Sequence, residues 1–298
     1  MIGISLGSWA FHTGPFANEP LPLERVLTRL AALDYDGVEI SGAAPHFPLH
    51  DASPSRRTGL RRKLEEYGLG ISGYFADLSA INPATDGAKP AYLDLFTRNV
   101  ELCADIGSPT IRVDAGAAQG TLSEWDYHRA GERLAGVWTE AANIAALHRV
   151  ALAWEFTPAF IYNKPTEVAA LHRRVDHPNF HVLFSTAHAY MSSVAGARQH
   201  GARETLTGGV PEFLKKLEDR VGAIHLIDSD GALDQRQTTR ARPFGEGHID
   251  FRALAPQLLD LPRIKWWSID LAGCPDAWDL LEPSRDFVLE MLNTKVAA

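Results

Sequence analysis

The chain has 298 residues, of which 45% are hydrophobic and 22% are charged, the balance of an ordinary globular protein. Its formal charge of −8 argues against a nucleic-acid-binding protein, which needs a broad basic surface, and no apolar run approaches the roughly 20 residues of a membrane span. The two cysteines, Cys103 and Cys274, lie far apart, and the first segment lacks signal-peptide features, so we expect a cytoplasmic protein in a reducing compartment.

Eight short apolar segments follow one another along the chain and have the length of buried strands. Each is followed by a longer segment in which apolar residues recur at three- and four-residue spacing, the period of a helix. The strand-like segments are 2–9, 37–42, 69–76, 110–116, 150–156, 181–188, 222–228 and 265–273. The helix-like segments are 22–33, 56–68, 92–107, 129–148, 166–175, 211–220, 250–260 and 278–293, and Gly68 and Gly107 are placed as helix C-caps.

Eight alternating units predict an α/β fold, a (β/α)₈ TIM barrel formed by a single domain over residues 1–298. An open, doubly wound sheet is the alternative, but no GxGxxG motif follows the first strand. Segment 229–249 is expected to be a long connection, and connections of that length in compact domains are often functional.

Side chains of a strand alternate between two faces, so the apolar positions of a barrel strand mark the face toward the helices. Trp154 faces outward in this reading, whereas Glu155 points into the barrel. The same alternation directs Ser185, His225 and Asp270 inward near the carboxyl ends of their strands, where such barrels carry active sites. Four further side chains are expected to point inward: Glu39, Tyr74, Arg112 and Asp114.

Two carboxylates and two imidazoles can meet at this rim, those of Glu155, Asp270, His188 and His225. This donor set suits Zn²⁺, Mn²⁺, Fe²⁺ or Co²⁺ better than Ca²⁺, because imidazole nitrogen is a borderline-soft ligand. The alternative is a hydrogen-bonded polar plug without a metal, and Arg112 and Asp114 can likewise pair with each other.

Six short motifs stand in order along the chain: "GVEI" (37–40), "WEFTP" (154–158), "FSTAHA" (184–189), "HLID" (225–228), "PFGEGHIDF" (243–251) and "WSIDLAG" (267–273). Together they resemble the sugar-phosphate isomerase/epimerase superfamily of xylose-isomerase-like barrels over nearly the whole chain. The resemblance implies a divalent metal (Mn, Zn, Co, Fe or Mg) held by Glu155, His225 and Asp270, with His188 on the substrate or on the metal.

Two positions depart from the family pattern. Ser185 stands where the family has an aspartate ligand, and Asp270 stands where it has a glutamate. A neutral hydroxyl is a poorer ligand than a carboxylate, so we expect weaker metal binding unless another group takes its place. Glu155 and Asp270 resemble the family's acid/base pair, and His188 completes the predicted catalytic set.

We therefore expect a divalent-metal-dependent isomerase, epimerase or lyase that acts on a small sugar, keto-sugar or polyol through an enediolate-type intermediate. The alternative is a non-catalytic or partner-dependent barrel subunit with a degenerate metal site, such as the large subunit of a two-component sugar-cleaving lyase. A DNA-repair endonuclease of the same superfamily is disfavoured by the net acidity. Family analogy also suggests a homodimer or tetramer. The substrate-binding candidates are Trp9, Glu39, Arg112, Arg242 and Glu246.

Overall fold

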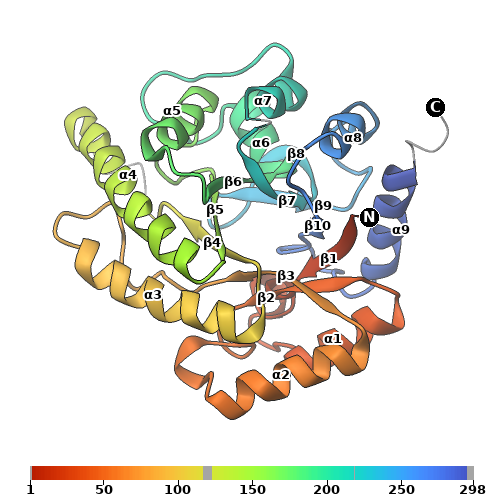
Figure 1. Cartoon of the computed structure of the whole chain (residues 1–298). Coiled ribbons are helices and arrows are strands. Elements are labelled where there is room, and N and C mark those ends of the chain that lie inside the picture. The colour runs from red at the N-terminus through yellow and green to blue at the C-terminus, as the bar shows by residue number, and fades with distance from the viewer. Residues whose placement is uncertain (1, 117–122, 218, 294–298) are drawn as a thin grey trace.

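The computed structural model describes residues 2–116, 123–217 and 219–293. Eight parallel strands close into a barrel in the order β1-β10-β7-β6-β5-β4-β3-β2, which confirms the predicted fold (Figure 1). The barrel strands are β1 (Gly3–Gly7), β2 (Gly37–Ser41), β3 (Gly70–Phe75), β4 (Thr110–Asp114), β5 (Ala151–Glu155), β6 (Phe180–Ser185), β7 (Val221–Leu226) and β10 (Trp266–Ile269).

Helices surround the strands as an outer ring (Figure 1). They are α1 (Leu23–Ala32), α2 (Pro54–Tyr67), α3 (Lys89–Ile106), α4 (Glu124–Leu147), α5 (Pro165–Val175), α7 (Gly209–Leu217), α8 (Phe251–Leu259) and α9 (Leu281–Asn293). Gly68 (φ 67°) and Gly107 (φ 82°) end α2 and α3 in the left-handed conformation, as predicted, because glycine adopts it without a steric penalty. In the described part of the chain, no helix is long and apolar enough to cross a bilayer.

The main hydrophobic core lies between the strands and the helices. Trp154 of β5 faces outward as predicted and packs on Trp138 of α4, with ring centroids 5.2 Å apart. Trp138 also stacks on Phe180 at the start of β6, at 5.6 Å. These buried aromatic rings hold α4 against two strands, and burial of each large side chain contributes about 1.5–3 kcal/mol.

A β-bulge in β3 reverses the orientation predicted for Tyr74. Val38 of β2 pairs with Ile71, but the next residue, Glu39, pairs with Gly73, so Ser72 is an extra residue in the ladder. Tyr74 consequently points outward, where its hydroxyl donates to the Phe47 carbonyl at 3.0 Å. The prediction that it points inward was wrong.

Small neutral groups line the interior near the amino ends of the strands, beside a cavity of about 270 Å³. Ser5 and Ser268 join their hydroxyls at 2.6 Å, and Ser268 donates to Ser72 at 3.4 Å; we refer to these three residues as the serine layer. Nearby, the indole of Trp266 lies against three glycines on neighbouring strands. A Cβ atom added to any of them would come within 2.6–2.8 Å of the ring: Gly3, Gly37 and Gly70.

The connection over residues 229–249 contains an antiparallel hairpin, β8 (Asp228–Leu233) and β9 (Thr239–Arg242), which the sequence did not predict. The buried Asp228 carboxylate anchors its base by accepting backbone N–H groups of Ser229, Gly245, Gly247 and Ile249. A short helix, α6 (Thr186–Tyr190), and a π-turn (Met191–Ala195) also follow β6 unpredicted. The hairpin and α6 both lie at the carboxyl ends of the strands.

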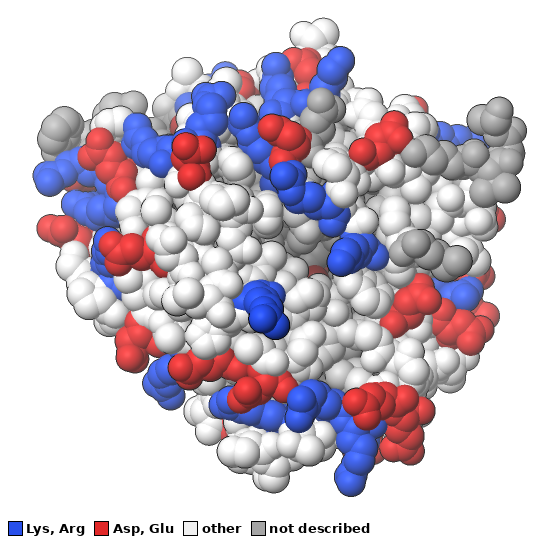
Figure 2. All heavy atoms as spheres, in the orientation of Figure 1, with Lys and Arg blue, Asp and Glu red and all other residues white. Residues whose placement is uncertain are grey.

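On the face shown in Figure 2, acidic and basic side chains are interspersed over the outer helices, and Lys or Arg side chains border the hollowed centre.

Candidate active site

A cavity of about 380 Å³ opens at the carboxyl ends of the barrel strands. Four of the predicted site residues line it, which are Trp9, Arg112, His188 and Asp270, together with Ser185. They lie near or just after the carboxyl ends of β1, β4, β6 and β10. The closed sheet therefore brings together residues that are far apart in the sequence. This is the face on which barrels of this kind carry their active sites.

Beneath the cavity lies a buried chain of ionisable side chains. The His225 ring contacts two carboxylates, with Nε2 2.8 Å from Glu39 Oε2 and Nδ1 3.3 Å from Glu155 Oε1. The other carboxylate oxygen of Glu155 forms an ion pair with the guanidinium of Arg112. We refer to Glu39, His225, Glu155 and Arg112 as the ion network. Predicted inward orientation is confirmed for all four.

The contacts of the ion network set its charges. Burial alone would lower the pKa of His225, but the charge of Glu39 and the hydrogen bonds to Glu155 and Glu39 raise it to about 10. Burial alone would raise the pKa of Glu155, but Arg112 and His225 lower it to about 2. At neutral pH the network therefore holds two carboxylates and two cations, and its net charge is close to zero.

His188 stands at the edge of the cavity in the first turn of α6. Its Nδ1 lies 2.7 Å from the Thr239 hydroxyl on β9, and its Nε2 lies 3.7 Å from Glu155 Oε1. Burial lowers the pKa of His188, partly opposed by the charge of Glu155, so the ring is neutral at pH 7 and can accept a proton. Ser185 serves this turn as its N-cap, because its hydroxyl accepts the backbone N–H of His188 at 3.4 Å.

Asp270 follows β10 and lines the cavity. In the barrel, β10 and β6 lie on opposite sides of β7, so Asp270 and His188 reach the cavity from different sides. Its Oδ1 accepts the indole N–H of Trp9 at 2.9 Å and the backbone N–H of Ala272 at 3.0 Å. The Trp9 ring also lies 5.2 Å from the His225 ring and 5.2 Å from the Arg112 guanidinium. Trp9 thus orients the carboxylate and covers the ion network.

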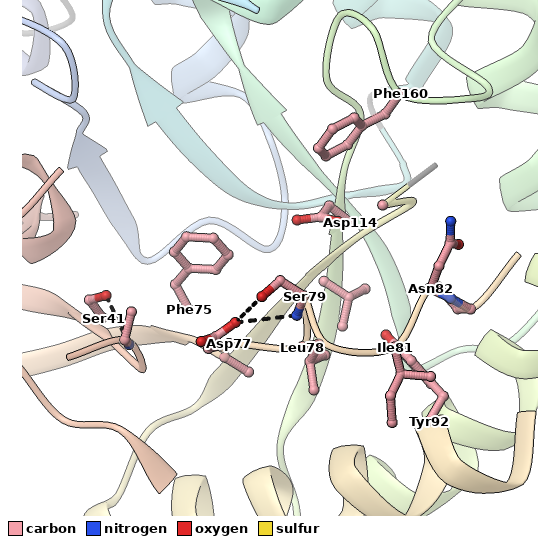
Figure 3. A pocket seen from close by; sticks show the side chains of 15 residues that line it. Ser41, Phe75, Asp77, Leu78, Ser79, Ile81, Asn82, Tyr92, Asp114 and Phe160 are labelled. Atoms are coloured by element: carbon pink, nitrogen blue, oxygen red, sulfur yellow. Dashed lines mark hydrogen bonds between the residues drawn. The ribbon is translucent and has the colours of Figure 1, made fainter. Parts of the chain in front are cut away.

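A second cavity of about 400 Å³ adjoins the first and shares Ser41, Ala43, Phe75, Asp114 and Phe160 with it. Figure 3 shows Asp114 on the same side as Phe75, above Asp77 and Ser79 of the polar loop that follows β3. That loop contributes Asp77, Ser79 and Asn82, and the Ser79 hydroxyl donates to Asp77 at 2.6 Å. Burial raises the pKa of Asp114, opposed by the charge of Arg112. Hydroxyl-binding groups beside aromatic rings suit a carbohydrate.

Sequence reasoning missed the loop residues Asp77, Ser79 and Asn82. The available signal was their position, directly after the third strand, at the rim where the other polar residues gather.

Two predicted substrate-binding residues do not join this site. Arg242 lies 3.6 Å from Asp230 and 3.7 Å from Glu246, so the two predicted residues interact with each other and with the base of the hairpin. Neither of them is among the described residues that line the rim cavity. The same hairpin instead presents Arg236 and Thr239 to the cavity.

The residues present do not fit a divalent metal as they are arranged. Both ring nitrogens of His225 face carboxylates, and the Glu155 oxygens face His225 and Arg112. Ser185 has no charge. The Arg112 guanidinium is paired with the carboxylate of Glu155, which a metal ion would need as a ligand. Among the described residues, no group of three or more His, Cys, Asp or Glu side chains is placed to hold a metal ion.

Comparison with known proteins places this site in a wider context. The model of the family described as xylose isomerase-like TIM barrel matches residues 27–276. The chain belongs to the xylose isomerase-like TIM barrel family. A curated relative, the fructoselysine 3-epimerase of Shigella flexneri, is 22% identical over 256 residues, which cover 83% of this chain and 85% of the relative.

Solved structures of other proteins share the fold. A D-tagatose 3-epimerase-like protein superposes with a TM-score of 0.76 at 20% identity, covering 99% of this chain and 100% of that one. The IOLI protein, crystallised with a zinc atom, superposes with a TM-score of 0.76 at 16% identity, and 98% of each chain is covered. The epimerase names agree with the expected class of enzyme, isomerase or epimerase.

Proposed function

We propose that the protein is an isomerase or epimerase that acts on a small sugar, keto-sugar or polyol and moves a proton on carbon through an enediolate-type intermediate. The observation that carries the proposal is that a carboxylate, Asp270, and a neutral imidazole, His188, line one cavity at the carboxyl rim of the barrel. The epimerase relative supports the same class of reaction. The aromatic and polar lining of the two joined cavities fits a carbohydrate.

The proton steps follow from the placement of these groups. One of the pair removes the proton from the carbon next to the substrate carbonyl. The electron pair of that C–H bond forms a C=C bond, and the π pair of the carbonyl moves onto its oxygen. The other returns a proton to the opposite face of the same carbon, which restores the carbonyl and yields an epimer, or to the former carbonyl carbon while the neighbouring hydroxyl loses its proton, which yields a shifted carbonyl. Glu155, predicted as the partner of Asp270, lies 3.7 Å behind His188 and would act through that ring.

Deuterium exchange tests the proposal across a panel of candidate sugars. The protein is incubated in D₂O with ketopentoses, ketohexoses and their amine-linked derivatives, and NMR detects deuterium on the carbon next to the carbonyl. Asp270→Asn should slow exchange by about 10²–10⁴-fold, the usual contribution of a positioned base. Asp279→Asn, a change at an exposed turn residue, is the matched control and should exchange like the wild type.

A second candidate is a barrel subunit that binds a sugar without turnover or needs a partner chain. The observation that favours it is the ion pair between Arg112 and Glu155, which occupies a predicted catalytic carboxylate. Saturable sugar binding without any deuterium exchange would support this candidate over the enzyme. Neither the fructoselysine 3-epimerase nor the tagatose 3-epimerase-like protein is named as a lyase. A homodimer or tetramer and a cytoplasmic location stay predictions.

A further inference from the structure

The position predicted for a divalent metal lies beside a protein cation. Arg112 forms an ion pair with Glu155, and the ring of His225 lies between Glu155 and Glu39. The Glu155 and His225 side chains are fully buried, and that of Arg112 is 11% exposed. A buried carboxylate needs compensating charge, and here Arg112 supplies it to Glu155.

The remaining predicted ligand positions also have protein partners. Ser185, in place of the aspartate, accepts the backbone N–H of His188, and Asp270 accepts the N–H groups of Trp9 and Ala272. Ser185 in place of the aspartate removes one anionic ligand from the rim. Arg112 places a fixed positive charge beside Glu155, one of the carboxylates that remain.

Arg112 also has unused hydrogen-bonding capacity. Its Nε and Nη1 atoms are buried and have no hydrogen-bond partner among the described residues, and Arg112 is one of the residues that line the rim cavity. The guanidinium lies 3.8 Å from the ring centroid of Phe75, which holds it in place. Buried N–H groups without a partner are rare, and at a cavity wall they indicate a ligand that accepts from them.

We propose that Arg112 takes the place of the divalent metal in this protein: its free N–H groups hold the carbonyl and neighbouring hydroxyl oxygens of the substrate, and the site works without a metal ion. The substrate role rests on the proposed isomerase function. A guanidinium suits the task because it is planar, stays charged and presents paired donors to two oxygens. When the base takes the proton from carbon, the negative charge on the former carbonyl oxygen is stabilised by Arg112, and reprotonation restores a carbonyl.

Metal binding is measured first, because it needs no substrate. Wild-type protein purified without chelator should contain far less than one equivalent of Mn, Fe, Co or Zn by elemental analysis. Calorimetric titration with Mn²⁺ and with Zn²⁺ should show no saturable site. The double variant Arg112→Met, Ser185→Asp should gain one site, whereas Ser185→Asp alone should gain none, because the guanidinium is still present. Circular dichroism checks that each variant is folded.

Activity then tests the substrate role. Deuterium exchange by the wild type should withstand EDTA, and Arg112→Met should lower its rate by about 10²–10³-fold, the usual loss when an oxyanion donor is removed. Arg112→Lys should recover part of that loss, since it keeps the charge without the paired donors. Arg57→Met is the matched control, because Arg57 pairs with Asp105 outside both cavities and its loss should leave exchange unchanged.

One tightly bound equivalent of metal in the wild type would overturn the inference, as would EDTA inhibition that Mn²⁺ reverses. If the wild type neither binds metal nor exchanges any sugar proton, the proposed function fails while the metal measurements still support the replacement of the metal by Arg112. The two proposals therefore fail in different experiments.

Discussion

Two layers of side chains occupy the barrel interior, and one is neutral whereas the other is charged. The serine layer, toward the amino ends of the strands, consists of Ser5, Ser72 and Ser268, whose hydroxyls bond to one another. The ion network above it joins Glu39, His225, Glu155 and Arg112. Both layers are buried, but only the second loses the hydration of four charges.

The difference separates a structural layer from a functional one. The hydroxyls of the serine layer are neutral and form hydrogen bonds with one another, so burying them costs little free energy of folding. Other small side chains can therefore replace them. Charges buried as pairs often contribute no more to stability than apolar residues of the same size would. The upper layer is therefore better explained by what it presents to the rim cavity than by what it adds to the fold. The two layers should respond differently to substitution.

Glu155→Gln should have the largest effect, because it leaves Arg112 and His225 beside a neutral amide. Breaking a buried ion pair from one side costs about 3–5 kcal/mol of unfolding free energy. Deuterium exchange should also fall below detection. Urea unfolding and the exchange assay measure the two losses. An unchanged urea midpoint would show that the ion network does not support the fold as the structure indicates.

The pH dependence of stability should come next. The pKa of His225 in the folded protein, about 10, exceeds its ordinary value of 6.5, so protonation stabilises the fold. This contribution is fully present below pH 6.5 and is lost as the pH rises to about 10. Urea unfolding across this range should show wild-type stability falling more steeply than that of His225→Gln, by up to about 1.4 kcal/mol per pH unit. Parallel curves would contradict a charged His225.

Thr239→Val should have a moderate effect, confined to the rim. The substitution removes the hydroxyl that lies 2.7 Å from His188 Nδ1 while keeping the shape of the side chain. Loss of one such hydrogen bond is worth about 1 kcal/mol, or roughly a fivefold fall in kcat. Because Thr239 positions His188, the pH profile of exchange should shift as well. A lower rate with an unchanged profile would indicate a structural role only.

Ser268→Ala should have the smallest effect and completes the contrast between the layers. It removes one hydroxyl from the serine layer and should cost about 0.5–1.5 kcal/mol in urea unfolding. Deuterium exchange should match that of the wild type. A loss of exchange similar to that of Glu155→Gln would remove the distinction drawn between the two layers.

The barrel could be predicted from the sequence because strands and helices differ in hydrophobic period, and every predicted strand overlaps an observed one. Segment 150–156, for example, contains β5 (Ala151–Glu155). The orientation of Tyr74 could not be predicted. One extra residue, Ser72, reverses which face each later residue of β3 occupies. Tyr74 and Phe75 are both aromatic, so residue type alone does not tell which of them points toward the helices. A bulge leaves no trace in the hydrophobic pattern.

The alternation of side chains along the strands predicted that Glu155 and His225 point to the same interior. It did not predict which side chains they contact there. Arg112 and Asp114 share a face of β4, so sequence proximity suggested that they pair. Instead the register sets Arg112 beside Ala153, and its long side chain extends to Glu155. The structure pairs Arg242 with Glu246 and Asp230, and these contacts were not predicted because the hairpin to which Arg242 belongs has no local sequence signature.

The tight contact of Trp266 with Gly3, Gly37 and Gly70 has a consequence for how this sequence can diverge. While the indole is present, none of the three glycines can accept even a methyl group, so each is closed to substitution. Once the tryptophan is replaced by a smaller residue, Gly3 and Gly70 become free and leave a void that larger side chains would fill, but Gly37 stays closed because an added Cβ atom would lie 2.7 Å from the Gly70 carbonyl oxygen. Trp266, Gly3 and Gly70 should therefore change together in related chains or not at all, and Gly37 should stay glycine.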